Sequence, residues 1–258
     1  MLIIVPSSET KQAPPEQGSP VALGGLSFPA LTPMRRRVLD ALLTTSAGPD
    51  AFDRLVVGPS LAGEVERNTH LRELPVRPAL EVYTGTLHGG LDATTLSPAA
   101  RARAASAVVL GSALWGLLRP SDGIPPYRLN ICSRLVGVER LEPAWRTVMP
   151  AVLAEAAGSR GAILDLRASS YQAMGMPVGM GDRTVTLRVE GDGAAGGRIG
   201  NVFVKRVRGQ AARHLLESGA DPETPDALAE VLGARWPVRL QQPVRRGGPW
   251  SLTVYLSV

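Results

Sequence analysis

The block "SPAARARAASAVVLGSALWGLLRP", residues 97–120, decides the fold class because it holds both a helix and a buried strand. Ser97 and Pro98 are typical of a helix start, since serine caps the first turn and proline fits the first helical position. The short apolar run 107–112 predicts a buried strand. Residues 113–118 predict a short helix that the closing proline ends. A strand set between helices indicates an α/β protein.

The rest of the chain repeats this mixture. Apolar or alternating runs predict strands at 2–5, 54–58, 162–166 and 251–258, and a hairpin with a glycine-rich turn at 183–205. Helical spacing and capping residues predict helices at 32–45, 144–158, 208–219 and 221–233, with a kink at Pro150. We expect a mixed sheet flanked by helices, and a single domain over residues 1–258, because no stretch is typical of an interdomain linker.

The charge of the chain favours an anionic partner. Its 258 residues carry a net charge of +5, and they include 26 arginines but only two lysines. Such a surplus attracts phosphates, so DNA or a small anionic ligand is the expected partner. A base composition biased toward arginine codons would give the same net charge.

Several classes of protein and site are not expected. The single cysteine, Cys132, rules out a disulfide within the chain, and the three histidines lack metal-ligand spacing, so we expect neither a bound metal nor a cofactor. Residues 1–9 turn polar too soon for a signal peptide, and no apolar run of about 18 residues predicts a transmembrane helix. We expect a cytoplasmic protein without membrane contact. Its oligomeric state does not follow from the sequence.

Polar side chains concentrate in loops that follow the predicted strands, where the sites of α/β proteins commonly lie. The candidates in these loops are Ser7, Ser8, Glu9, Lys11, Tyr83, Thr84, Ser112, Arg119, Asp122, Tyr127, Arg128, Arg167, Tyr171, Lys205, Arg206, Arg208 and Arg213. Together they predict a cationic cleft formed by strand-end loops. In any one of these loops, the same residues would also be expected in a solvated turn or a structural salt bridge.

The two lysines both belong to this set. An ammonium group is a compact charge whose pKa shifts readily on burial, whereas a guanidinium is a rigid and permanently charged fork. Because the chain otherwise uses arginine, Lys11 and Lys205 indicate positions that need an ammonium group. With only two lysines, coincidence gives the same pattern. The surroundings of Ser112 do not form a nucleophile elbow, so a serine hydrolase is not expected.

Five motifs then occur in a specific order along the chain. They are MLIIVPSSETK (1–11), VYTGTL (82–87), GLLRPSDGIPPYRL (116–129), DLRASSY (165–171) and FVKRVRGQAAR (203–213). The ordered set resembles the YaaA family of bacterial peroxide stress proteins, and the resemblance covers most of the chain. The chain departs from the family pattern at Trp115, where tyrosine is usual, after Lys11, where threonine is usual, and in the tail from about Asp221.

The resemblance implies a cytoplasmic α/β protein with a basic cleft, which acts in the hydrogen peroxide response and limits iron-driven oxidative damage. It also implies DNA binding through a helix-hairpin-helix-like element. In this chain that element is helix 208–218, the turn 218–221 and helix 223–232. The second helix is acidic, which disfavours contact with phosphates.

Two kinds of function follow from the sequence. The first is binding of DNA or another anionic ligand through Ser8, Lys11, Tyr83, Thr84, Arg119, Arg128, Arg167, Arg208 and Arg213. The second is a specialised enzyme for a small anionic or nucleobase-like substrate, with acid–base catalysis by Lys205, Asp122, Tyr127 and Ser112. A broad basic surface would favour the first, and an enclosed cavity with shifted pKa values would favour the second.

Overall fold

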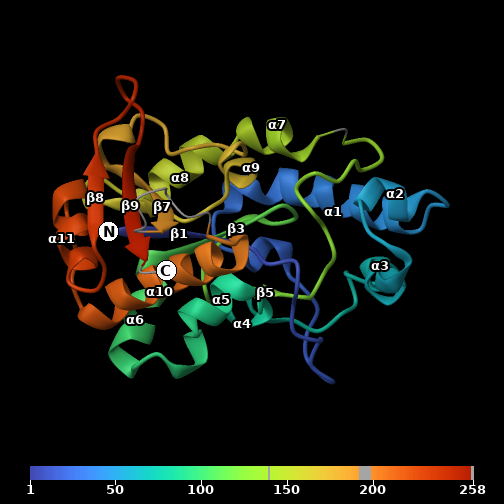
Figure 1. Ribbon diagram of the computed structural model, residues 1–258. Helices are drawn as coiled ribbons and strands as arrows, with labels where there is room; N and C mark the ends of the chain where they lie inside the picture. Colours follow the sequence, from blue (N-terminus) through green and yellow to red (C-terminus); the bar gives the residue numbers. More distant parts are fainter. Residues whose placement is uncertain (139, 192–198, 257–258) are drawn as a thin grey trace.

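The computed structural model describes residues 1–138, 140–191 and 199–256, and a mixed sheet runs through its centre (Figure 1). The strand order is β4-β3-β1-β6-β7-β9-β8. The first strand, β1 (Leu2–Pro6), lies between β3 and β6 and is parallel to both. The other strands of this sheet are β3 (Val108–Ser112), β4 (Gly116–Leu118), β6 (Ile163–Asp165), β7 (Thr184–Gly191), β8 (Val238–Gln241) and β9 (Trp250–Leu256). A second small sheet pairs β2 (Arg77–Pro78) with β5 (Gly123–Ile124).

Helices cover both faces of the central sheet. The α-helices are α1 (Thr32–Ser46), α2 (Ala51–Leu55), α3 (Ala62–Asn68), α4 (Ala79–Val82), α5 (Thr86–Leu91), α6 (Pro98–Ala107), α7 (Leu141–Arg146), α8 (Met149–Ala157), α9 (Ser169–Gln172), α10 (Asn201–Ser218) and α11 (Pro225–Gly233). Short 3-10 turns are η1 (Leu23–Gly25), η2 (Pro29–Leu31), η3 (Pro59–Leu61), η4 (Ala93–Thr95) and η5 (Gly181–Arg183). None of the helices in the described part of the chain combines the length and the apolar character that a bilayer crossing requires.

The first strand shows how the two faces are built. Successive side chains of a strand point to opposite faces, and all four apolar residues of β1 are buried. Leu2 and Ile4 pack into a core that includes residues of α1, α7 and α8. Ile3 and Val5 pack into a second core that includes residues of α5, α6, α10 and α11. Figure 1 shows α7 and α8 on one side of the sheet and α6 and α10 on the other.

The predicted α/β class is confirmed, and most predicted elements are present with small shifts in their bounds. The strands predicted at 2–5, 107–112, 162–166 and 251–258 correspond to β1, β3, β6 and β9, although residues 257–258 lie outside the described residues. The helices predicted at 32–45, 208–219 and 221–233 correspond to α1, α10 and α11. The predicted kink at Pro150 is a break between two helices, because this proline occupies the first turn of α8.

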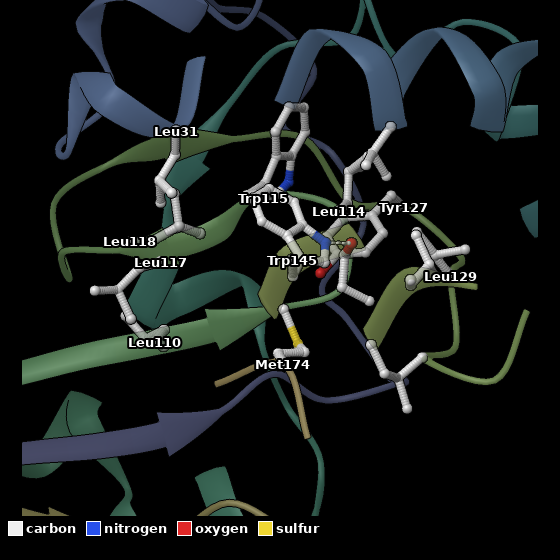
Figure 2. Close-up of a cluster of buried hydrophobic side chains, with 14 of the residues drawn as sticks. Leu31, Leu110, Leu114, Trp115, Leu117, Leu118, Tyr127, Leu129, Trp145 and Met174 are labelled. Carbon is white, nitrogen blue, oxygen red and sulfur yellow. Dashed lines mark hydrogen bonds between the residues drawn. The ribbon is translucent and has the colours of Figure 1, made fainter. Parts of the chain in front are cut away.

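The helix predicted at 113–118 is wrong. The chain makes a tight turn after β3 and returns as β4, which is antiparallel to β3. Gly116 has a φ of 71°, a left-handed conformation that glycine adopts without strain. A Cβ atom at this position would lie 2.6 Å from the ring of Trp145. Figure 2 shows Trp145 beside Trp115 in the buried cluster that this turn covers.

The hairpin predicted at 183–205 is also wrong in its second half. The first strand is β7, but its partner beyond β6 is β9, which pairs with it in parallel. Residues 201–205 are the first turns of α10, so Lys205 lies on a helix and not at a strand end. The predicted glycine-rich turn falls largely on residues 192–198, outside the described residues. The strand predicted at 54–58 is wrong too, because Leu55 ends α2 and Val56 takes a left-handed conformation.

Candidate functional site

A cavity of about 520 Å³ lies beyond the carboxyl ends of β1 and β6. This is where parallel sheets of α/β proteins commonly bind ligands, because strand-end loops and helix starts converge there. Five segments form its walls: the loop 6–10 after β1, residues 85–88 at the start of α5, the loop 130–132, residues 166–171 after β6, and α10. Two of the lining residues are basic, Lys205 and Arg208, and one is acidic, Glu9.

Two glycines bring α5 and α10 together beside this cavity. A Cβ atom at Gly209 would lie 1.9 Å from the carbonyl oxygen of Leu87, and one at Gly90 would lie 2.2 Å from that of Arg206. Real Cβ atoms do not approach other atoms so closely, so the two helix backbones touch only because both positions lack a side chain. The contact fixes the part of α10 that carries Lys205 and Arg208 against the cavity wall.

Arg208 is the less exposed of the two cations that line the cavity. One Nη atom donates a hydrogen bond to the carbonyl oxygen of Leu187 at 3.1 Å. Its Nε is buried and has no hydrogen-bond partner among the described residues, which also provide no carboxylate in contact with the guanidinium. Burial lowers the pKa of Arg208, and the charge of Asp165 opposes that change. Lys205 lies one turn earlier on α10 and is exposed.

Lys11 lies behind the cavity wall and holds the loop after β1. Its Nζ donates to the carbonyl oxygens of Ser8 at 2.7 Å and Glu9 at 3.3 Å. It also lies 4.1 Å from the centre of the Tyr127 ring, a cation–π distance. Burial lowers the pKa of Lys11 to about 7, and the charge of Arg128 acts in the same direction. The ammonium group therefore donates to two backbone carbonyls and lies against an aromatic face.

Ser112, Tyr127 and Tyr83 form a hydrogen-bonded cluster under this loop. The Tyr127 hydroxyl lies 2.6 Å from the Oγ of Ser112 and 3.0 Å from the hydroxyl of Tyr83. Ser112 also accepts hydrogen bonds from the backbone N–H groups of Leu114 and Trp115. All three side chains are at most 3% exposed, and Figure 2 shows Tyr127 packed against apolar neighbours. Burial raises the pKa of Tyr83 and that of Tyr127 above the usual range, so both phenols stay protonated.

Asp122 and Arg119, also candidates from the sequence, support a turn away from the cavity lining. One carboxylate oxygen of Asp122 accepts hydrogen bonds from the N–H and the hydroxyl of Ser27, and the other accepts from the N–H of Arg119. The Arg119 guanidinium donates to the carbonyl oxygen of Ser106 and lies over the ring of Phe28. These contacts account for both side chains as structural groups.

Three further arginines are occupied by contacts within the protein. Arg167 is buried and forms a bidentate pair with Asp165, with N–O distances of 2.9 and 2.7 Å. Arg213 donates to the carbonyl oxygens of residues 91, 92 and 95. Arg128 pairs with Glu9 at 2.7 Å. Arg128 and Arg213 therefore each fix one segment of chain to another, whereas Arg167 pairs with the end of the strand that precedes it.

The structure places several of the candidate residues from the sequence around two different cavities. The residues selected from the sequence that line the cavity are Ser7, Ser8, Glu9, Tyr171, Lys205 and Arg208, and Lys11 supports its wall. Tyr83 and the exposed Thr84 instead line a second cavity of about 630 Å³ between α4, α5 and α6.

Comparison with known proteins agrees with this ordered arrangement of motifs. The family model described as peroxide stress protein YaaA matches residues 1–238. This chain belongs to the YaaA family. A UPF0246 protein of Streptomyces coelicolor is 41% identical, over 98% of each chain. UPF0246 proteins of Corynebacterium efficiens and Corynebacterium glutamicum are 37% and 32% identical, over at least 90% of this chain and 91% of their own.

Among the cavity residues of this YaaA-family protein that the sequence did not single out, His88 is the titratable side chain buried in the wall. His88 lines both cavities and is 7% exposed. Its Nε2 lies 2.9 Å from the carbonyl oxygen of Pro6, while its buried Nδ1 has no partner among the described residues. Burial lowers its pKa to about 4, so the ring is neutral at physiological pH. Its position three residues after the VYTG motif is the signal that the sequence offers, whereas the spacing of metal ligands does not identify it.

The helix pair expected to bind DNA is present as α10 and α11. Gly219 ends α10 with a φ of 73°, and Thr224 caps α11. Arg213, the last arginine of the fifth motif, is held by the segment that precedes α6. Among the described residues, no group of three or more His, Cys, Asp or Glu side chains is placed to hold a metal ion.

Proposed function

We propose that this YaaA-family protein binds a small anionic ligand in the cavity between α5, α10 and the carboxyl ends of β1 and β6, with Lys205 and Arg208 as the cations of the site. The peroxide stress response is the setting that family membership supports. Limiting iron-driven damage would then be an indirect effect of ligand binding, because the proposal assigns no metal site.

The observation that carries this proposal is the state of Arg208. A partly buried guanidinium without a carboxylate partner is stabilised when an anion completes its surroundings. Arg119, Arg128, Arg167 and Arg213 each make two or more contacts within the protein, whereas Arg208 has one backbone carbonyl and, like Arg128, a buried Nε without a partner among the described residues. The cavity volume of about 520 Å³ is typical of sites for small molecules.

Duplex DNA is the second candidate ligand, because Lys205 and Arg206 are exposed on α10. A duplex is too wide for the cavity and would contact only its rim. Acid–base catalysis by Lys205, Asp122, Tyr127 and Ser112 is favoured less by the geometry. Ser112 and Tyr127 are buried, and the Asp122 carboxylate already accepts three hydrogen bonds.

Calorimetric titration with sulfate, and separately with a short duplex DNA at two salt concentrations, tests the proposal. We expect saturable sulfate binding that Arg208→Gln weakens about tenfold or more, because hydrogen bonds to charged groups contribute roughly 1.5–3 kcal/mol. Arg206→Gln is the matched control, since Arg206 lies on the same helix but does not line the cavity. Equal sulfate affinities of Arg208→Gln and wild type would refute the proposal. Tight, salt-sensitive DNA binding without sulfate binding would support the second candidate.

A further inference from the structure

The cavity is much larger than the anion that Lys205 and Arg208 would hold. Its volume of about 520 Å³ falls in the range of roughly 300–1,000 Å³ in which proteins enclose drug-sized molecules. Because both cations belong to α10, an anion bound to them lies at one wall of this space. A ligand that fills the cavity therefore has a carbon skeleton beyond its anionic head, and the other walls show which chemistry that skeleton has to match.

Hydroxyl groups surround the rest of the space. Six lining side chains carry one each: Ser7, Ser8 and Thr10 after β1, Thr86 on α5, and Ser170 and Tyr171 on α9. The large apolar residues of the lining, Leu87, Ile131 and Leu166, are at most 5% exposed. A matching skeleton needs polar groups for these hydroxyls and C–H groups for the carbon atoms that carry them.

Three of the hydroxyls have capacity left for a ligand. Thr86 and Ser170 are half-buried, and neither hydroxyl has a hydrogen-bond partner in the part of the chain that the structure describes. The hydroxyl of Ser7 donates to the phenol oxygen of Tyr171 at 3.2 Å, so the hydrogen of Tyr171 remains available. Since a hydroxyl both donates and accepts, these groups fit a ligand that does the same.

Two acceptors in the lining favour a ligand with hydrogen-bond donors of its own. The carbonyl oxygen of Pro6 can only accept, so the Nε2 of His88 that lies 2.9 Å from it carries the ring hydrogen, and Nδ1 is left with a lone pair. That buried Nδ1 has no partner among residues 1–138, 140–191 and 199–256. The half-exposed Glu9 carboxylate accepts from Arg128 and Asn130, one bond to each oxygen, and keeps lone pairs for a further donor.

We infer that the ligand is a phosphate monoester whose carbon skeleton carries several hydroxyls, the chemistry of a polyol phosphate or a sugar phosphate, and that Thr86 and Ser170 bind those hydroxyls. The inference rests on the proposed anion site, which it extends from the head of the ligand to the rest of the molecule. Hydroxyls fit because each can donate to an acceptor such as Glu9 and accept from a donor such as Tyr171. An apolar skeleton would cover these groups without replacing their hydrogen bonds to water, which is unfavourable.

Calorimetric titration of the full chain with matched pairs of phosphate monoesters tests the inference. Glycerol 3-phosphate is compared with propyl phosphate, and ribose 5-phosphate with tetrahydrofurfuryl phosphate. The members of each pair share the phosphate head and the carbon skeleton, and they differ in their hydroxyls. We expect the hydroxylated member to bind about tenfold more tightly, or better, in at least one pair, as the gain of several neutral hydrogen bonds predicts.

Two substitutions that each remove one hydroxyl locate the effect. We expect Thr86→Val and Ser170→Ala each to weaken binding of the preferred hydroxylated ester by about threefold to tenfold, and to leave inorganic phosphate binding unchanged. Thr84→Val is the matched control, because Thr84 is exposed and lines the second cavity but not this one. It should change neither affinity.

The outcomes distinguish the inference from the anion site on which it rests. If inorganic phosphate binds in an Arg208-dependent way but neither hydroxylated ester binds more tightly than its partner, the inference is wrong and the anion site stands. The same holds if Thr86→Val and Ser170→Ala both bind the hydroxylated esters like wild type. If wild type binds neither phosphate nor any ester, or Arg208→Gln changes no affinity, both the anion site and the inference are wrong.

Discussion

Two neighbouring regions contain similar residue types but differ in whether their polar groups have hydrogen-bond partners. They are the cluster of Lys11, Tyr83, Ser112 and Tyr127 and the cavity beside it. In the cluster, three hydroxyls bond one another and the ammonium is covered by two carbonyls and an aromatic ring. In the cavity, Arg208 and Tyr171 keep donors that no described residue accepts. Polar groups that satisfy one another stabilise a fold, while groups with spare capacity can recognise a ligand. The residue types alone do not show whether a polar group has a hydrogen-bond partner.

The largest expected effect comes from the contact that holds the cavity together. Gly209→Ala would place a Cβ 1.9 Å from the carbonyl oxygen of Leu87 and force α10 away from α5. We expect the free energy of unfolding to fall by about 3 kcal/mol, at the upper end for overpacking, and sulfate affinity to fall with it. Urea denaturation and calorimetry measure the two quantities.

Gly89→Ala is the matched control for this substitution. Gly89 also lies on α5, but a Cβ there would meet no atom within 4 Å. Because alanine favours helix over glycine, we expect this variant to gain up to about 1 kcal/mol of stability. Equal effects at Gly209 and Gly89 would show that close helix contact does not shape the cavity.

Lys11 tests the comparison through the pH dependence of the protein's stability. Its pKa is about 7 in the folded protein and near 10.5 when exposed, so between these values the unfolded chain binds the extra proton. The burial penalty is therefore fully present below pH 7 and is relieved as the pH rises. We expect wild type to gain about 1 kcal/mol per pH unit relative to Lys11→Met between pH 7 and 9. Urea denaturation of both proteins at pH 6, 7, 8 and 9 gives the difference, and a constant difference would argue against a buried ammonium.

The smallest expected effect is at Lys205, which the sequence singles out as a position for an ammonium group. Lys205 is exposed at the cavity, so Lys205→Arg keeps the charge with little strain. We expect sulfate affinity to change by less than about tenfold, because the guanidinium differs in shape and hydration but not in charge. If the change reaches that seen with Arg208→Gln, the ammonium has the larger role and the ranking of the two cations is reversed.

The sequence predicts the α/β class and most buried strands because short apolar runs carry that information locally. It predicts a helix at 113–118 because the turn depends on Gly116 meeting Trp145, a contact between distant segments. It predicts a strand at 201–205 because valines alternate there. In the structure these residues belong to α10, a helix held by its close contact with α5. The state of each arginine depends on distant partners in the same way. Arg213 donates to carbonyls more than a hundred residues away in sequence. Arg208 donates to the carbonyl of Leu187, and its Nε has no partner among the described residues.

The central claim is that the Arg208 guanidinium is the anion-binding group of the cavity. Nitrogen-15 NMR of the arginine side chains during a sulfate titration tests it most directly, because the Nε–H signal of a buried arginine is resolved from those of solvated ones. We predict that the Arg208 Nε–H signal, assigned by its absence in Arg208→Gln, shifts saturably with the calorimetric affinity. Saturable sulfate binding with an unmoved Arg208 signal, or shifts confined to exposed arginines, would contradict the account.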